Sequence, residues 1–146
     1  MAKKAAMQRK TLNAPDEVRT FDKGRVELAK VGTVTFGRAT LHPGWKWSES
    51  VKPIVKTEYC EAPHVQYHAS GRLAVRMADG SELEFGPGDV GVIPPRHDAW
   101  VVGDEPVVVI DISGMKEYAK PTARKKAPKK TAKPKRKSRP RGRRAR

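Results

Sequence analysis

The sequence has a single cysteine, and aromatic residues make up only 6% of its 146 residues. Cys60 alone cannot form an internal disulfide, so a reducing compartment such as the cytoplasm is expected. No apolar run approaches the roughly 18 residues that cross a bilayer, and the run 107–110 is followed at once by Asp111. We therefore expect no membrane partner.

Motifs of common nucleotide-binding and hydrolase sites are also missing. The sequence contains no nucleophile elbow, no phosphate-binding loop and no dinucleotide fingerprint. Residues 86–89, Gly-Pro-Gly-Asp, are rich in glycine, but they join two predicted strands. Because no helix begins there, the backbone N–H groups that bind anions at a helix N-terminus are absent. No enzyme class follows from motifs of this kind.

Acidic residues are absent from 120–146, where fifteen of the 31 lysines and arginines lie. Residues 11–119 contain twelve basic and sixteen acidic residues, so the formal net charge of +15 comes from the two ends of the chain. This division predicts one folded domain, 16–119, between a disordered leader, 1–15, and a disordered tail, 120–146. A domain of about 100 residues can bury its own core.

The tail consists mainly of Lys, Arg, Ala and Pro and has no aromatic or large aliphatic residue to bury. It resembles the tails of linker histones and of bacterial histone-like proteins. Its charge favours sequence-independent binding to nucleic acid or another polyanion, with a Kd on the order of 10⁻⁴ to 10⁻⁶ M at physiological salt. A solvated extension without a partner is the alternative. The candidate contact residues are Lys125, Lys126, Lys129, Lys130, Lys135, Arg136, Lys137, Arg139, Arg141, Arg143 and Arg144.

Apolar and polar residues alternate through much of the predicted domain, which is typical of β-strands. The expected strands cover 25–29, 33–41, 64–68, 72–77, 82–85, 90–93 and 106–112. Asp79 and Gly80 predict a two-residue type I′ hairpin turn. The connection 42–63 is expected to be a long loop pinned by tryptophans, and 115–119 a single frayed turn. These patterns predict an all-β fold.

Two segments resemble the cupins, which are small antiparallel β-barrels with a metal or ligand site inside. HVQYHASGRLAV at 64–75 and GPGDVGVIPPRHDAW at 86–100 carry the resemblance, and Gly71, Gly88 and Pro94 match the family's scaffold positions. PGWKWSESVKP and HDAWVVGDEP also look like a bacterial group of single-domain cupins. The resemblance covers about residues 20 to 118. It implies a single jelly-roll barrel of about six to eight antiparallel strands, and a homodimer paired through N-terminal strands.

The metal-ligand positions of the cupin motifs are occupied differently here. The resemblance places His64 at the family's glutamate, Glu58 and Cys60 at its paired histidines, and Ala99 at its second-motif histidine. Residues two apart in a strand share a face, so His97 can supply the imidazole that Ala99 lacks. The candidate ligands are His64, His97, Cys60 and Glu58, which suit zinc or iron. The alternative is a polar pocket without metal, in which Cys60 is a small buried apolar residue.

A ligand pocket is expected beside this site. Gln66 and His68 share a strand face with His64, and Trp45, Trp47 and Trp100 either fill the barrel or stack on a ligand. We therefore predict a small-molecule or metal-binding cupin, a sensor or binding module, with a polyanion-binding tail. A metal-dependent isomerase, hydrolase or oxygenase acting on a small polar substrate is the alternative.

Overall fold

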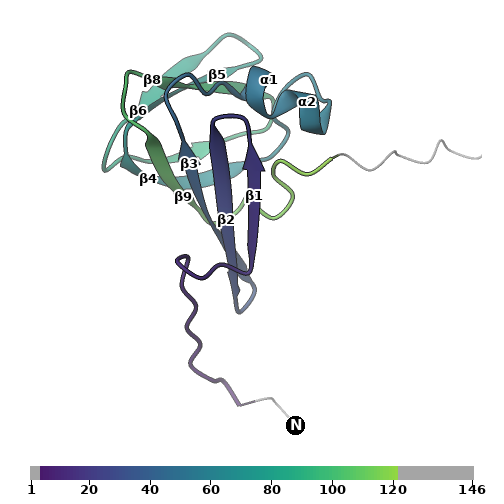
Figure 1. The fold of residues 1–146 in the computed structure, drawn as a ribbon, viewed down its shortest axis with the longest axis vertical. Coiled ribbons are helices and arrows are strands. Elements are labelled where there is room, and N and C mark those ends of the chain that lie inside the picture. The colour runs from purple at the N-terminus through teal and green to yellow at the C-terminus, as the bar shows by residue number, and fades with distance from the viewer. Residues whose placement is uncertain (1–3, 122–146) are drawn as a thin grey trace, which may run out of the picture.

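The computed structural model describes residues 4–121, and the rest of the chain, including the predicted tail contacts, lies outside the described residues. Two antiparallel sheets of six and three strands form the fold, with strand orders β1-β2-β3-β9-β4-β7 and β6-β5-β8 (Figure 1). This arrangement is consistent with a cupin jelly roll, and the predicted all-β fold is confirmed. The strands are β1 (Glu17–Phe21), β2 (Gly24–Val31), β3 (Val34–Leu41), β4 (His64–Ser70), β5 (Arg72–Met77), β6 (Glu82–Phe85), β7 (Val90–Ile93), β8 (His97–Val102) and β9 (Val107–Asp111).

The described chain has nine strands rather than the six to eight expected. The added strand at the N-terminus is β1, which pairs with β2 over its whole length. A tight turn makes this pairing possible, because Lys23 adopts a positive φ of 56° and Phe21 pairs directly with Gly24. Sequence alternation did not reveal β1 because its residues are mostly exposed, so no apolar face marks it.

The hairpin between β5 and β6 is confirmed, but its predicted turn type is wrong. Gly80 has a φ of 91°, whereas Asp79 does not have the positive φ that a type I′ turn requires. The Asp79 carboxylate instead accepts hydrogen bonds from the N–H and the hydroxyl of Ser81, at 2.9 and 2.6 Å. These contacts favour a loop one residue longer, closed by the Met77 N–H donating to the carbonyl of Ser81.

The connection 42–63 is not the irregular loop that was expected, because it contains two short helices, α1 (Trp47–Ser50) and α2 (Lys52–Val55). Pro53 lies in the first turn of α2, where a proline costs no hydrogen bond. Trp45 and Trp47 are buried in the core and anchor this segment to the barrel.

Among the described residues, no helix is long and apolar enough to cross a membrane.

The two sheets enclose one core, and strand alternation decides which side chains reach it. On β4, His64, Gln66 and His68 are buried while Val65 and Tyr67 are exposed. On β8, His97 and Ala99 are buried, as their shared parity predicts. Two segments that are distant in sequence therefore direct imidazoles into the same barrel.

Burying the imidazole of His68 in this core costs free energy of folding. It is 0% exposed and stacks on Phe85 with 4.7 Å between ring centroids, yet neither of its ring nitrogens has a hydrogen-bond partner among the described residues. An unsatisfied buried polar group costs about 1–3 kcal/mol. The pairing of β4 with β9 shifts register directly after His68.

We expect His68→Leu to raise the free energy of unfolding by about 1–2 kcal/mol, because it removes two unsatisfied nitrogens from the core. Urea unfolding of the two proteins measures the change. His42→Leu, at an exposed position, is the control and should leave stability unchanged. A His68→Leu protein less stable than the original would show that the imidazole makes a favourable interaction.

Candidate metal centre

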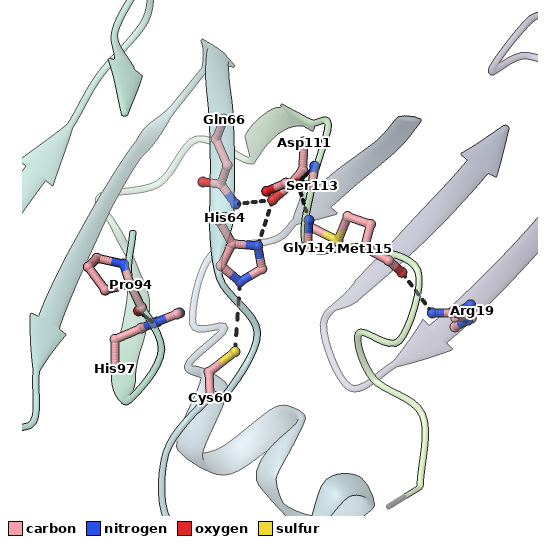
Figure 2. Close-up of polar contacts among 10 residues, drawn as sticks. All are labelled: Arg19, Cys60, His64, Gln66, Pro94, His97, Asp111, Ser113, Gly114 and Met115. Atoms are coloured by element: carbon pink, nitrogen blue, oxygen red, sulfur yellow. Dashed lines mark hydrogen bonds and ion pairs between the residues drawn. The ribbon is translucent and has the colours of Figure 1, made fainter. Parts of the chain in front are cut away.

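Three buried side chains converge at one end of the barrel. One ligand atom from each of Cys60, His64 and His97 lies within 4.8 Å of the others. Cys60 is held beside β8 by its N–H, which donates to the carbonyl of His97 at 2.9 Å. Figure 2 shows His64 between Cys60 on one side and Asp111 with Gln66 on the other. The group is therefore assembled from β4, β8 and the segment that precedes β4.

Asp111, at the end of β9, fixes the orientation of His64. Its Oδ2 lies 2.5 Å from Nδ1 of His64 and accepts a second hydrogen bond from Gln66 at 3.2 Å (Figure 2). Its Oδ1 accepts from the backbone N–H groups of Ser113 and Gly114, each at 2.8 Å. Burial alone would raise the pKa of Asp111, but these hydrogen bonds, chiefly that of His64, lower it below its usual value. The ionised carboxylate thus keeps the proton of His64 on Nδ1.

His97 is oriented in the same way by a backbone group. Its Nδ1 lies 2.7 Å from the carbonyl oxygen of Pro94, which can only accept a hydrogen bond. The ring proton is therefore on Nδ1, and Nε2 carries a free lone pair. Both histidines thus have the arrangement of metal-binding imidazoles, in which one nitrogen donates to a carboxylate or carbonyl and the other is available to the metal.

The separation of two of the donor atoms matches the spacing of neighbouring ligands on a small tetrahedral cation. Sγ of Cys60 lies 3.7 Å from Nε2 of His64. A tetrahedral zinc ion with sulfur at about 2.3 Å and nitrogen at about 2.0–2.1 Å places these two ligands roughly 3.6 Å apart. One sulfur and two imidazoles are a donor set for zinc or iron, whereas magnesium and calcium need oxygen ligands. The residues present therefore fit the expected metal.

The protonation of Cys60 depends on whether a cation is bound. Burial raises the pKa of its thiol to about 12, so the metal-free protein carries the neutral thiol near pH 7. A metal binds the thiolate, and binding therefore releases a proton. Metal affinity should rise steeply with pH for this reason.

In the metal-free protein, stability should fall in acid. Burial lowers the pKa of His97 from 6.5 to about 4, and it also lowers the pKa of His68. Below pH 6.5 His97 is protonated in the unfolded chain but stays neutral in the folded protein. The free energy of unfolding therefore decreases as the pH falls from 6.5 toward 4. His97 alone accounts for about 3 kcal/mol of this loss. Urea unfolding in a chelator across this range measures it, and a flat profile would contradict buried, neutral imidazoles.

A small cavity lies inside the barrel beside the cluster. Its volume is about 30 Å³, and His64, Gln66, His97 and Trp45 are among its lining residues. Oε1 of Gln66 and the indole N–H of Trp45 are buried without a hydrogen-bond partner in the described part of the chain. About 10–15 Å³ of such space is enough to hold a water molecule, which needs polar partners of this kind. The interior is therefore too small for a large ligand but is suited to one water-sized molecule.

A larger groove of about 450 Å³ lies outside this cavity. Its walls come from α1, α2, the segment before β4 and the segment after β9, and they include Cys60. Trp47 and Tyr118 line both the groove and the inner cavity. A ligand in the groove would therefore lie next to the cysteine of the cluster.

Residues 113–119 form one wall of this groove and are not a frayed turn. Met115 and Tyr118 are 2% and 7% exposed. The guanidinium of Arg19 on β1 donates to the carbonyl oxygens of Met115, Lys116 and Tyr118 at 3.0, 2.8 and 2.6 Å. Arg19 thus holds the segment 113–119 in place beside the groove. Figure 2 shows its hydrogen bond to the carbonyl oxygen of Met115.

The structure brings together three of the four predicted ligands and leaves one outside. Glu58 is exposed and does not belong to the cluster. Among the predicted pocket residues, Gln66, Trp45 and Trp47 line the inner cavity. His68 lies instead against Phe85. Trp100 is half-buried between the cations of Lys46 and Arg76 on the other side of β8, because its parity is opposite to that of His97.

Asp111 and Tyr118 were missed by sequence reasoning. Asp111 could have been found, because 107, 109 and 111 share the buried parity of β9 and an acid on a buried face needs a partner. Tyr118 lies beyond the last strand, where no periodicity indicates burial. Its position depends on Arg19, a contact 99 residues away in sequence.

Comparison with known proteins identifies the fold but not the activity. No protein-family model matches the chain, and no curated protein matches it. A structure of unknown function from Rhizobium leguminosarum bv. viciae is similar, with 19% identity over 75% of this chain and 98% of its own, at a TM-score of 0.53. A DUF1255 protein of unknown function from Acidithiobacillus ferrooxidans has 19% identity over 68% and 88%, at 0.50. A cupin-like protein from Thermotoga maritima has 18% identity over 66% and 73%, at 0.47.

Proposed function

We propose that the protein binds one zinc or iron ion through Cys60, His64 and His97, and that zinc is the better fit. The observation that carries this proposal is the pair of buried histidines whose Nδ1–H groups donate hydrogen bonds to the carboxylate of Asp111 and the carbonyl oxygen of Pro94. One nitrogen of each ring lies within 4.8 Å of the sulfur of Cys60 and of the other ring. Without a metal, the thiol of Cys60 has only Nε2 of His64 at 3.7 Å as a side-chain partner, and burying three such groups together is costly.

The groove beside Cys60 supports a second element of the proposal, the binding of a small molecule next to the metal. Its volume of about 450 Å³ lies within the range of about 300–1,000 Å³ typical of small-molecule sites. Three protein ligands leave one tetrahedral position for water or a ligand atom. We propose a sensor or binding module in which the metal binds the polar end of a small ligand.

The count of three ligands also favours the enzymatic alternative, because catalytic zinc sites commonly have three protein ligands and one open position. Asp111 and Gln66 supply no nucleophile, since both are engaged with His64 or with each other. A bound metal would supply Lewis-acid activation or an activated water, while the protein residues orient the ligands and exclude solvent. Turnover of a small substrate would distinguish this alternative from a sensor.

For the basic tail we propose a separate role as a polyanion tether. The supporting observation is its composition, with fifteen basic residues and no acidic residue in 120–146. No folded element is needed for this interaction, because binding to phosphates through released counterions requires only charge.

Metal analysis tests the first proposal. Protein purified without a histidine tag and equilibrated with zinc, then desalted, should retain about one zinc per chain. Iron under anaerobic conditions should occupy the same site. Less than a tenth of an equivalent of either metal would contradict the proposal, whatever ligand the groove binds.

A further inference from the structure

The outer face of the six-stranded sheet is apolar over β9, β4 and β7. Val90 and Val92 are 76% and 71% exposed, and Val65, Tyr67 and Ile112 are 40%, 47% and 46% exposed. They are neighbours, because Val65 pairs with Val92 and Tyr67 pairs with Val90 across the strands. We call these five residues together with Ile110 the β4/β7/β9 face. Ile110 connects the two parts, since it pairs with Tyr67 on the other side.

The solvent-exposed face of the three-stranded sheet is charged, in contrast to the β4/β7/β9 face. Between β5 and β6, Arg72 forms an ion pair with Glu84 at 2.5 Å and Arg76 forms one with Glu82 at 2.9 Å. An antiparallel sheet with one solvated face is normally polar on that face. The β4/β7/β9 face has no charged residue and therefore lacks the expected character of a solvated surface.

The edge of the same sheet is also unprotected. β7 is the last strand in the order, and among residues 4–121 no strand pairs with its outer edge. Natural proteins protect such edges with lysine, proline, charge or a bulge, and none of these lies within Val90–Ile93. The opposite edge strand, β1, carries Glu17 and Arg19 as an ion pair. The edge that carries charge is thus β1, whereas the edge strand that borders the β4/β7/β9 face carries none.

We propose that a second copy of this chain covers the β4/β7/β9 face, through a two-fold axis that packs the face against its own copy. The five side chains with the exposures given above present roughly 450 Å² to solvent, on the order of the apolar part of the about 800 Å² that each partner buries in a standard interface. A face without charge does not repel its copy. Two sheets pack face to face about 10 Å apart, and closed two-fold symmetry stops further assembly.

This interface differs from the N-terminal strand pairing that the family resemblance implied. It leaves the groove beside Cys60 accessible, because no residue of the β4/β7/β9 face lines that groove. The dimer is therefore independent of the metal proposal, and either can fail without the other.

Sedimentation of the full-length chain in high salt, after nuclease treatment, tests the dimer. The wild type should have twice the mass of the 16.2 kDa chain at micromolar concentrations. Val92→Lys should be monomeric with an unchanged thermal midpoint. Val92→Thr keeps the shape of the side chain and should weaken the dimer about tenfold in Kd. Leu83→Lys, at an exposed position on β6 in the three-stranded sheet, should remain dimeric.

Two results would overturn the proposal. One is a wild type that is monomeric at all accessible concentrations, including a monomer that binds a different protein through this face. The other is a dimer that persists in Val92→Lys, which would place the interface elsewhere. Should Val92→Lys fail to fold, the concentration dependence of the wild type and of Val92→Thr still decides the question.

Discussion

Replacing Cys60 with serine, or either His64 or His97 with alanine, is expected to abolish stoichiometric metal binding. Each variant removes one of three donor atoms that lie within 4.8 Å of one another. Two protein ligands cannot satisfy a tetrahedral zinc ion, so we expect affinity to fall by at least about 100-fold, since loss of a mere outer partner already costs about 10–100-fold. Competition with a chromogenic chelator measures this change.

Asp111→Asn gives a graded test of the same centre. Asparagine keeps the size of the side chain but removes the charge that fixes the proton of His64 on Nδ1. We expect a loss of about 10–100-fold in affinity, smaller than that from removing a ligand. Equal losses in Asp111→Asn and Cys60→Ser would indicate that folding, not ligation, has been disturbed.

Two matched controls separate ligation from general effects. Glu58→Ala removes the carboxylate that the sequence pattern predicted as a ligand but that lies exposed outside the cluster. His42→Ala removes an exposed imidazole. Both proteins should retain full metal content. Loss of metal in Glu58→Ala would show that the segment before Cys60 closes over the cation.

Ending the chain at Pro121 is expected to abolish binding to nucleic acid. This change removes fourteen basic residues and lowers the formal net charge from +15 to +1. The full-length protein should shift random-sequence DNA with an affinity that falls steeply with salt, because each phosphate contact releases counterions. The shortened protein should not shift it, and gel-shift titration at several salt concentrations measures the difference.

A chain with the tail residues in shuffled order is the matched control, and it should bind as well as the natural chain because the tail reads no sequence. The shortened protein should keep its metal content and thermal midpoint, since all three metal ligands precede residue 98 and Arg19 still binds the segment 115–118. DNA binding by the shortened protein would place the binding surface on the barrel.

The alternation of apolar and polar residues predicts most strands of this fold. It misses elements whose residues are mostly exposed or that are too short to show a period. β4 alternates between buried and exposed side chains, so alternation marks it clearly, whereas β8 alternates only between buried and half-buried side chains. β1 is mostly exposed and has no such mark. The helices α1 and α2 have four residues each, too short for a helical period to be recognised. In the site, the parity rule placed His97 correctly because it lies in a strand.

Glu58 fails the same rule because it does not lie in a strand. Parity between 58 and 60 requires an extended chain, but the chain bends here, where the Thr57 hydroxyl donates to the carbonyl of Tyr59 at 2.7 Å. Arg96 shows a related limit. It adopts a φ of 71°, in the left-handed region that favours glycine, and its guanidinium lies over the ring of Tyr59 at 5.7 Å. The sequence alone does not indicate that Arg96 adopts this positive φ.

The absorption spectrum of the cobalt-substituted protein tests the central claim most directly, because it reports both the geometry of the site and the presence of sulfur. Cobalt commonly replaces zinc, and a tetrahedral site with one thiolate and two imidazoles should give intense visible bands and a near-ultraviolet band from sulfur-to-cobalt charge transfer. Both should saturate at one cobalt per chain, and the ultraviolet band should disappear in Cys60→Ser. A weak octahedral spectrum without the charge-transfer band would contradict a metal centre formed by Cys60, His64 and His97.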